Sequence, residues 1–345
     1  MRIVEDEDVL GARVEAVDLA RPLAPGDVRD ILFALGERGV LVFPGQDLDP
    51  PALAAFAAQF GDLEINVANR FHASGHPEVM ILSNMVENGK PIGFADAGQG
   101  WHTDVSYSRE IALSTMLHAK RVPVRDGAPR GNTEFLSMRH AYDDLPDKVK
   151  ARIEELSAIH DFAKFWNMML ARPGTDRLPL SEAQRQKRPP VAQKIVRRHP
   201  VTGKKVLYCN PGYAVRIEGL EPAESDDLLE YLFAHQAQRK YFHAHRWRVG
   251  DVLMWDRHRH DAQRRRRLRP RRAALHVPGA GAGEGGLARA EAEKARDERK
   301  RGAANRVVSG LGRRRHVGEQ QFREIALLGR HCRLGHALLG RERLE

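Results

Sequence analysis

The aromatic residues of this 345-residue chain stop almost completely at Asp256, and this break most constrains what the chain can fold into. Of 22 Phe, Trp and Tyr residues, only Phe322 lies beyond that point. Large apolar side chains supply much of the area that a core buries, so a long segment with one aromatic residue cannot easily build a core. The sequence therefore predicts a folded body at 1–256 and a distinct tail at 257–345.

The basic charge of the chain is confined to the same tail. From Arg257 onward there are 24 Arg and Lys residues and 10 Asp and Glu residues, so the tail has a net charge of +14. Because the whole chain has a net charge of +10, the body at 1–256 has a net charge of −4. Basic segments often bind nucleic acid. Binding of nucleic acid through the tail is thus one alternative function, although the absence of interleaved aromatic residues and of any known motif disfavours it.

Cysteine usage and the N-terminus indicate a cytoplasmic protein. Cys209 and Cys332 are too few for a disulfide framework, as is typical of a reducing compartment. The N-terminal MRIVEDEDVL is acidic and has neither a basic n-region nor an apolar h-region, and no apolar run is long enough to span a membrane. We therefore expect a cytoplasmic protein without a membrane partner, and a homo-oligomer is left open.

Short apolar runs separated by turn residues dominate the body. The run at 39–43 and the runs on either side of the turn at 249–251 are typical of strands. Asp27–Glu37 is predicted as an amphipathic helix and Asp49 as the cap of another, while the proline-rich segment 172–190 is predicted as a loop or lid. Many short strands with a few peripheral helices favour a mainly β sandwich or jelly roll.

One tetrapeptide, Trp101-His102-Thr103-Asp104, carries the strongest chemical signal. Side chains two residues apart on an extended segment point to the same side, so His102 and Asp104 are expected to converge. With a second histidine they form the facial triad of non-haem Fe(II) sites, which leaves positions open for a bidentate cosubstrate and O2. The spacing alone is weak, because most His-x-Asp pairs are surface pairs without chemistry.

Longer segments around this pair resemble the taurine dioxygenase (TauD/TfdA) family, in the order of the family and over about residues 8–256. They include LGARVEAVDLARPL, FPGQDLDPPALAAFAAQFGDL, GWHTDVSY, GNTEF, HPVTGKKVLYCNPGYAVRIEGL and HRWRVGDVLMWD. The resemblance implies a double-stranded β-helix (jelly roll) that uses Fe(II), 2-oxoglutarate and O2. It also implies hydroxylation of a small, anionic organic substrate with release of succinate and CO2.

The resemblance assigns individual residues as well. His102 and Asp104 match the first two iron ligands of the family, and Thr133 matches the threonine that binds the cosubstrate carboxylate. The residues predicted to face the substrate are Trp101, Asn66, Asn69, Phe165, Trp166 and Arg216. Core packing for Trp101 and an exposed strand position for Arg216 are equally good interpretations.

The family pattern breaks after Trp255-Asp256, where the family carries its second iron histidine and the arginine that binds the far carboxylate of 2-oxoglutarate. Ala262 occupies the histidine slot, and His258 and His260 lie four and two residues early. His260 is taken as the candidate third ligand. We interpret the break as a one-base slip of reading frame near His258, since re-reading with free third bases gives TGTMHNAVADYGPDEPRYMCRGQV, with a histidine at position 262 and arginines at 274 and 278.

The chain as given is therefore expected to be a poor or inactive enzyme, with a catalytically dead jelly-roll protein as the alternative. The missing segment would supply late strands of the barrel. The tail has little β-branched or aromatic content, so residues beyond about Arg257 are expected to be disordered or loosely helical and not to complete the barrel.

Overall fold

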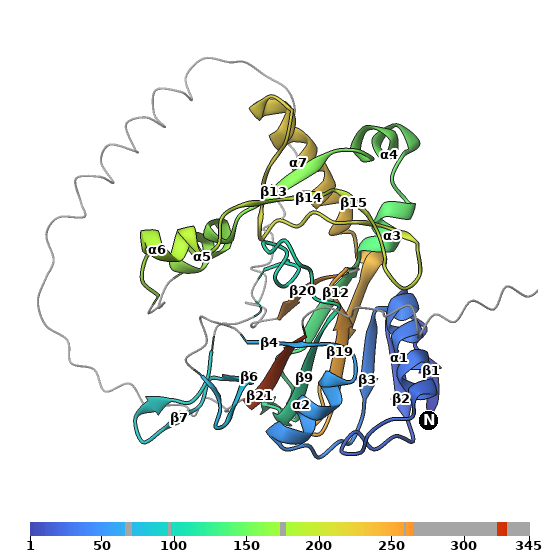
Figure 1. Ribbon diagram of the computed structural model, residues 1–345, viewed down its shortest axis with the longest axis vertical. Helices are drawn as coiled ribbons and strands as arrows, with labels where there is room; N and C mark the ends of the chain where they lie inside the picture. The colour runs from blue at the N-terminus through green and yellow to red at the C-terminus, as the bar shows by residue number, and fades with distance from the viewer. Residues whose placement is uncertain are drawn as a thin grey trace, which may run out of the picture. The chain divides into compact units, whose positions relative to one another are not determined.

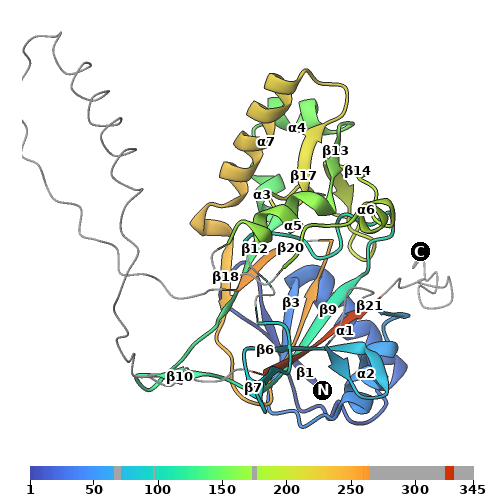
Figure 2. The same ribbon diagram turned by 90° about the vertical axis from the view of Figure 1, so that its left-hand side faces the viewer.

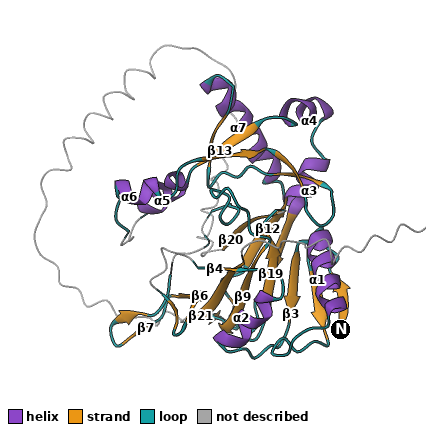
Figure 3. Cartoon of the chain, in the orientation of Figure 1, coloured by secondary structure: helices purple, strands orange, loops and turns teal. Residues whose placement is uncertain are grey.

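The computed structural model describes residues 1–65, 71–95, 98, 100–172, 177–258, 260–264 and 323–329, and of the last two ranges it describes the backbone only. All of these residues belong to one compact unit. Figures 1 and 3 show the large sheet with α1 and α2 beside it, while α3 to α7 gather around β13 and β14. No helix in the described ranges has the length and apolar character needed to cross a bilayer.

The largest sheet has the strand order β1-β2-β3-β19-β9-β21-β6-β5, and β4 pairs with β21 outside this path. Its central strand β19 pairs antiparallel with both β3 and β9, and Trp255 lies opposite Thr115. The strands are β1 (Arg2–Glu5), β2 (Ala12–Glu15), β3 (Val40–Phe43), β4 (Leu63–Glu64), β5 (His72–Ala73), β6 (His76–Ser83), β9 (Ser114–Arg121), β19 (Val252–Asp256) and β21 (Arg323–Gly329).

Two further three-stranded sheets accompany the large one. The first has the order β18-β12-β20, formed by β12 (Thr133–Ser137), β18 (Phe242–His245) and β20 (His260–Arg264); the second has the order β14-β13-β17, formed by β13 (Ser157–His160), β14 (Val191–Lys194) and β17 (Ala214–Ile217). Three small hairpins pair β7 (Val86–Glu87) with β8 (Lys90–Pro91), β10 (Val124–Arg125) with β11 (Ala128–Pro129), and β15 (Val196–Arg198) with β16 (Lys205–Leu207).

The helices form where the sequence predicts them in the N-terminal part. The Asp49 carboxylate accepts a hydrogen bond from the Ala52 amide at 2.9 Å, which confirms its capping role. The first long helix ends at Gly39, whose φ of 70° is a left-handed conformation that glycine adopts without strain. The helices are α1 (Pro25–Arg38), α2 (Pro50–Ala58), α3 (Met138–Asp143), α4 (Asp147–Ile153), α5 (Phe162–Leu170), α6 (Glu182–Gln186), α7 (Pro222–Gln236) and the 3-10 helix η1 (Arg239–Tyr241).

The centre of the large sheet is buried on both faces, and β19 shows how. Val252 and Met254 belong to a core cluster with residues of α1 and α2. Leu253 and Trp255 point the other way, into a cluster that contains Phe135 of β12. The molecule therefore stacks helices on one face of the sheet and a second sheet on the other, and Figure 2 shows α1 and α2 beside the large sheet. The prediction of a mainly β fold with peripheral helices is confirmed.

The prediction that nothing beyond Arg257 joins the sheets is wrong at two places. The backbone of β20 pairs antiparallel with β12, with Ala262 opposite Phe135. The backbone of β21 lies between β9 and β6 and pairs antiparallel with both. Composition argued against strands here, but the edges of β9, β6 and β12 carry backbone donors and acceptors that need partners. Apart from Arg257 and His258, the remaining residues of the tail, 274 and 278 included, lie outside the described ranges.

The segment 172–190 also differs from the prediction of a plain loop. Within its described part, residues Glu182–Gln186 form the short helix α6. Ser181 caps it with a capping box, because its hydroxyl accepts from the Gln184 amide and the Gln184 side chain accepts from the Ser181 amide. A local capping signal thus gives this segment some regular structure of its own.

Candidate functional site

The Trp101-His102-Thr103-Asp104 segment lies in the connection that precedes β9, outside the named strands. Residues 104–107 form a turn, so the prediction of an extended segment is wrong from Asp104 onward. Val105 has a φ of +61°, which is costly for a β-branched residue. Such strain persists only where surrounding contacts hold the backbone in place, and it is concentrated at functional sites.

The structure brings the side chains of His102 and Asp104 together. The His102 Nδ1 lies 2.8 Å from the Gly100 carbonyl oxygen, which can only accept, so Nδ1 carries a proton. The Nε2 atom lies 3.3 Å from the Asp104 Oδ1. At this distance the two atoms share either a second ring proton or a cation, so the pair has the donor types that could hold a metal ion.

The second oxygen of Asp104 is held by a chain of hydrogen bonds. The Thr115 hydroxyl donates to Asp104 Oδ2 at 3.0 Å, and Arg257 Nε donates to the same hydroxyl oxygen at 2.6 Å. Burial raises the pKa of Asp104, but the His102 imidazole, the Arg257 guanidinium and the Thr115 hydroxyl outweigh this effect and lower the pKa to about 2. The carboxylate is therefore ionised at any physiological pH, as a metal ligand must be.

A buried hydrogen-bond network supports the loop from below. The Ser106 hydroxyl accepts from Asn210 Nδ2 at 3.0 Å and lies 3.0 Å from His160 Nδ1. The side-chain amide of Gln193 donates to the carbonyl oxygens of Ser106 and Ser108, at 3.1 and 2.7 Å. Because Ser106, His160, Asn210 and Gln193 are all buried, these contacts fix the path of the loop two residues after Asp104.

Gly212 lets another chain segment approach His102 closely. A Cβ atom at this position would lie 2.9 Å from the His102 Cβ and 3.2 Å from the Trp101 carbonyl oxygen. Real Cβ atoms do not come so close to carbon atoms, so any other residue would displace His102. The glycine of the NPGY segment is thus part of the support of the site.

Aromatic rings form one wall beside His102. The Phe165 ring lies 5.5 Å from the imidazole, and the Tyr213 ring lies 6.4 Å from it. Tyr213 also contacts Phe165 at 5.2 Å and Tyr107 at 4.9 Å. The half-buried Trp101 ring packs edge-on against Phe242 at 5.6 Å and joins the neighbouring core cluster. These contacts favour core packing as the role of Trp101.

The predicted lid contributes a cation to this wall. Arg188 Nη1 donates to the Tyr107 hydroxyl at 2.9 Å, and the guanidinium lies 4.6 Å from the Phe162 ring. Trp166, in contrast, is turned toward the lid itself. Its Nε1 donates to the Leu178 carbonyl oxygen at 2.8 Å, and the Arg177 guanidinium lies 4.8 Å from its ring.

The other predicted residues fall in different places. Thr133 is buried at the start of β12, where its hydroxyl oxygen accepts from Trp247 Nε1 at 3.0 Å. Arg216 is an exposed residue of β17 opposite Ile159. This agrees with the alternative interpretation of Arg216 as an exposed strand residue. Asn66 and Asn69, also predicted to face the substrate, lie outside the described ranges.

The third metal ligand is not brought to His102 and Asp104 by any side chain that the structure describes. Those side chains include no group of three or more His, Cys, Asp or Glu residues that could hold a metal ion. His258 packs against His199, with ring centroids 5.9 Å apart, and its amide donates to Asp256 at 2.7 Å. Burial lowers the pKa of His258 to about 4. His260 pairs with Ser137 through its backbone, and its side chain lies outside the described part.

Asp256 of the Trp255-Asp256 motif has a structural role. It is fully buried and accepts a hydrogen bond from His199 Nε2. The other ring nitrogen of His199 accepts from the amides of Val201 and Thr202, at 3.2 and 3.1 Å. The motif therefore joins the end of β19 to the turn at 199–204 and does not face the metal pair.

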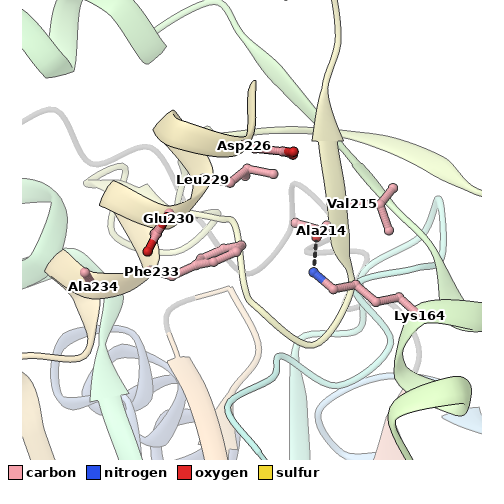
Figure 4. Close-up of a pocket in the computed structure, with 8 residues that line it drawn as sticks. All are labelled: Lys164, Ala214, Val215, Asp226, Leu229, Glu230, Phe233 and Ala234. Atoms are coloured by element: carbon pink, nitrogen blue, oxygen red, sulfur yellow. Dashed lines mark hydrogen bonds between the residues drawn. The ribbon is translucent and has the colours of Figure 1, made fainter. Parts of the chain in front are cut away.

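A separate pocket of about 430 Å³ opens between α5, β17 and α7, and Figure 4 shows its lining. The Lys164 ammonium donates to the Ala214 carbonyl oxygen at 2.5 Å and lies 5.6 Å from the Phe233 ring. Neither His102 nor Asp104 lines this pocket. We therefore do not take it as the reaction site.

Sequence reasoning missed three residues that surround the metal pair. Tyr107 ends the GWHTDVSY segment and Tyr213 ends the NPGY segment. Both segments resemble the family, so the sequence contains a signal that could have identified these two residues. Arg257 was assigned to the tail because of its position in an arginine-rich run, although it is 1% exposed. No sequence signal distinguishes it from the arginines that follow.

Comparison with known proteins identifies the family of the chain independently of the site geometry. Residues 5–260 match the family described as taurine catabolism dioxygenase TauD, TfdA family. The chain is 38% identical over 279 residues to an alpha-ketoglutarate-dependent 2,4-dichlorophenoxyacetate dioxygenase of Cupriavidus pinatubonensis, which covers 76% of this chain and 93% of that protein. It is 30% identical to a pentalenolactone F synthase of Streptomyces avermitilis, over 72% and 83% of the two chains. The crystal structure of AAD-2 in complex with Mn(II) and N-oxalylglycine has a TM-score of 0.63 at 30% identity, over 77% of this chain and 91% of that one.

Proposed function

The chain belongs to the TauD/TfdA family of dioxygenases, and from that premise we propose that it is an Fe(II)- and 2-oxoglutarate-dependent dioxygenase that hydroxylates a small anionic organic substrate. The observation that carries this proposal is the 3.3 Å approach of His102 Nε2 to Asp104 Oδ1, with a proton of the imidazole held at Nδ1. We propose in addition that the two facing sheets form the family's jelly roll.

His102 and Asp104 fit two of the three protein ligands of a facial triad. When bound, Fe(II) and 2-oxoglutarate would supply the oxidising chemistry that converts a C–H bond and O2 into an alcohol, with release of succinate and CO2. The Gly100 carbonyl holds the imidazole in the tautomer that binds metal, and Thr115 orients the carboxylate.

Thr133 is proposed to bind a carboxylate of 2-oxoglutarate. Because Trp247 Nε1 donates to its hydroxyl oxygen, the hydroxyl proton is left to donate to another group. Thr133 is the first residue of β12 and lies opposite His245 and Arg264 in the register of the sheet. Its position is therefore set by strand pairing on both sides, as a binding residue requires.

An aromatic acid is the substrate class that the wall beside His102 supports. Phe165 and Tyr213 place aromatic rings next to the proposed metal site, and Arg188 donates to the Tyr107 hydroxyl. Relatives named for 2,4-dichlorophenoxyacetate and phenoxypropionate act on acids of this kind. We propose Phe165 and Arg188 as substrate-facing residues. Trp166 and Arg216 are weaker candidates, because the first holds the lid and the second is exposed.

The chain as given is proposed to be a weak enzyme, because Ala262 occupies the slot of the family's second iron histidine and the arginine for the far carboxylate of 2-oxoglutarate is missing. Loss of a mere supporting partner lowers metal affinity or activity by about 10–100-fold, so loss of a ligand should have a larger effect. A frame restored from position 258 onward would place a histidine at position 262, on a strand whose backbone already pairs with β12.

The test is succinate release with Fe(II), 2-oxoglutarate and O2 across a panel of phenoxyacetates, phenoxypropionates and alkyl sulfonates. It should be run on the chain as given, on the frame-restored chain and on Asp104→Asn in both. We expect measurable succinate from the restored chain, more with an aryloxy acid, and none above background from Asp104→Asn. A restored chain that releases no more succinate than its Asp104→Asn variant would end the proposal.

A further inference from the structure

Arg257 is a buried cation whose hydrogen-bonding capacity is mostly unused. Its amide donates to the Leu113 carbonyl oxygen at 2.9 Å, which fixes the backbone just beyond β19. Its Nε donates to Thr115, and its side chain is fully enclosed. Within the described part of the chain, Nη1 and Nη2 have no hydrogen-bond partner.

The nearest carboxylates do not satisfy this guanidinium. Glu64 Oε2 lies 3.8 Å from Nη1, which is a charge contact beyond hydrogen-bond distance. Asp104 is linked to Arg257 through the Thr115 hydroxyl. A guanidinium presents five N–H donors, so four remain after the bond to Thr115. A buried charge without sufficient partners is strongly disfavoured, and this points to a further anion at Nη1 and Nη2.

The surroundings of Arg257 are those of the proposed reaction site. Burial raises the pKa values of Tyr107 and Tyr213, and the positive charge of Arg257 opposes that effect in both. The guanidinium therefore lies within electrostatic reach of Asp104 and of the aromatic wall. Its two terminal nitrogens form the planar fork that matches a carboxylate with two parallel hydrogen bonds.

We propose that Arg257 is a carboxylate-binding residue, and that its Nη1 and Nη2 hold the carboxylate of an organic acid bound beside Asp104. This inference rests on the proposed function, since the acid is either 2-oxoglutarate or the organic substrate. Arg257 would thus supply the site with a guanidinium. Its position differs from that of the family arginine that binds the far carboxylate of 2-oxoglutarate, which this sequence lacks. Glu64 is the internal competitor that the incoming carboxylate replaces.

The experiment measures equilibrium binding by calorimetry on the full chain, with Mn(II) and without O2, using N-oxalylglycine and phenoxyacetate as separate probes. We expect Arg257→Lys to weaken one probe by about 10-fold or more, because it keeps the charge but loses a charge-assisted pair. Arg257→Met should weaken the same probe further, and Glu64→Gln should strengthen it several-fold. Loss confined to N-oxalylglycine assigns the cosubstrate, and loss confined to phenoxyacetate assigns the substrate.

The matched control is Arg13→Lys, which changes an arginine with the same 3.8 Å contact to a glutamate but with 53% of its side chain exposed. It should bind both probes as the wild type does. Wild-type affinity for both probes in Arg257→Lys and Glu64→Gln would overturn the proposal, as would a wild type that binds neither probe. If Arg257→Met fails to fold by circular dichroism, the other two variants decide. Binding that depends on Arg257, together with no succinate release from the frame-restored chain, would sink the proposed function and leave this inference standing.

Discussion

Lowering the pH from 7 to 5 should destabilise the folded chain through one histidine, His160. This residue of β13 is fully buried, and its Nδ1 lies 3.0 Å from the Ser106 hydroxyl. Its Nε2 has no hydrogen-bond partner in the described part of the chain. Burial, aided by the charges of Lys164 and Arg197, lowers the pKa of His160 from 6.5 to about 3. The imidazole is therefore neutral in the fold and becomes charged readily only when the chain unfolds.

The sign and the size of the effect follow from these two pKa values. Between pH 6.5 and about 3 the unfolded chain binds one more proton at this position, so the free energy of unfolding falls as the pH falls. The contribution is complete above pH 6.5 and is lost progressively below it. One pKa unit corresponds to about 1.4 kcal/mol, so the loss at pH 5 should be about 2 kcal/mol.

The assay is urea unfolding of the wild type and of His160→Asn at pH 7, 6 and 5. Asparagine keeps an acceptor for the Ser106 hydroxyl but does not titrate. Other groups titrate in both proteins and cancel in the difference. The stability advantage of the wild type over the variant should therefore shrink by about 2 kcal/mol between pH 7 and pH 5. Parallel pH profiles for the two proteins would refute the reasoning.

Three further predictions concern the site. Asp104→Asn should weaken Mn(II) binding by more than about 100-fold, because it removes a ligand and not merely a supporting partner; titration followed by electron paramagnetic resonance measures this, and unchanged affinity would contradict the metal assignment. Gly212→Ala should also weaken Mn(II) binding, since the new Cβ lies 2.9 Å from the His102 Cβ; an unaltered affinity would show that the loop yields without displacing the ligand. Thr133→Val should weaken N-oxalylglycine by about 10-fold while leaving Mn(II) affinity unchanged, because only a hydroxyl donor is lost; calorimetry with each ligand separates the two effects, and equal loss of both would indicate a structural role.

The sequence was informative where the controlling interactions are local. The prediction that His102 and Asp104 converge is confirmed, although a turn with Val105 at positive φ, and not an extended segment, brings them together. The cap at Asp49 and the turn at 249–251 between β18 and β19 were equally local. Caps and turns can be predicted from the sequence because they depend only on the backbone geometry of neighbouring residues.

Long-range contacts were not predictable in the same way. Arg257 lies 142 residues from Thr115, and His160 lies 54 residues from Ser106. The first pair meets because β19, which ends just before Arg257, pairs with β9, and the second because the turn at 104–107 packs against β13; composition carries no information on such pairings. The same limit explains why Arg257 was assigned to the tail.

The position of β21 has a consequence for how the chain folds. It fills the slot between β9 and β6, although it comes about 200 residues later in the chain than β9. Pairing across such a separation raises the contact order and slows folding, because a large loop must close before any backbone hydrogen bond forms. While the chain is being synthesised, β9 and β6 must therefore wait with open edges after most of the body has left the ribosome. We expect that interval to be the time at which nascent chains are most prone to aggregate and most dependent on chaperones.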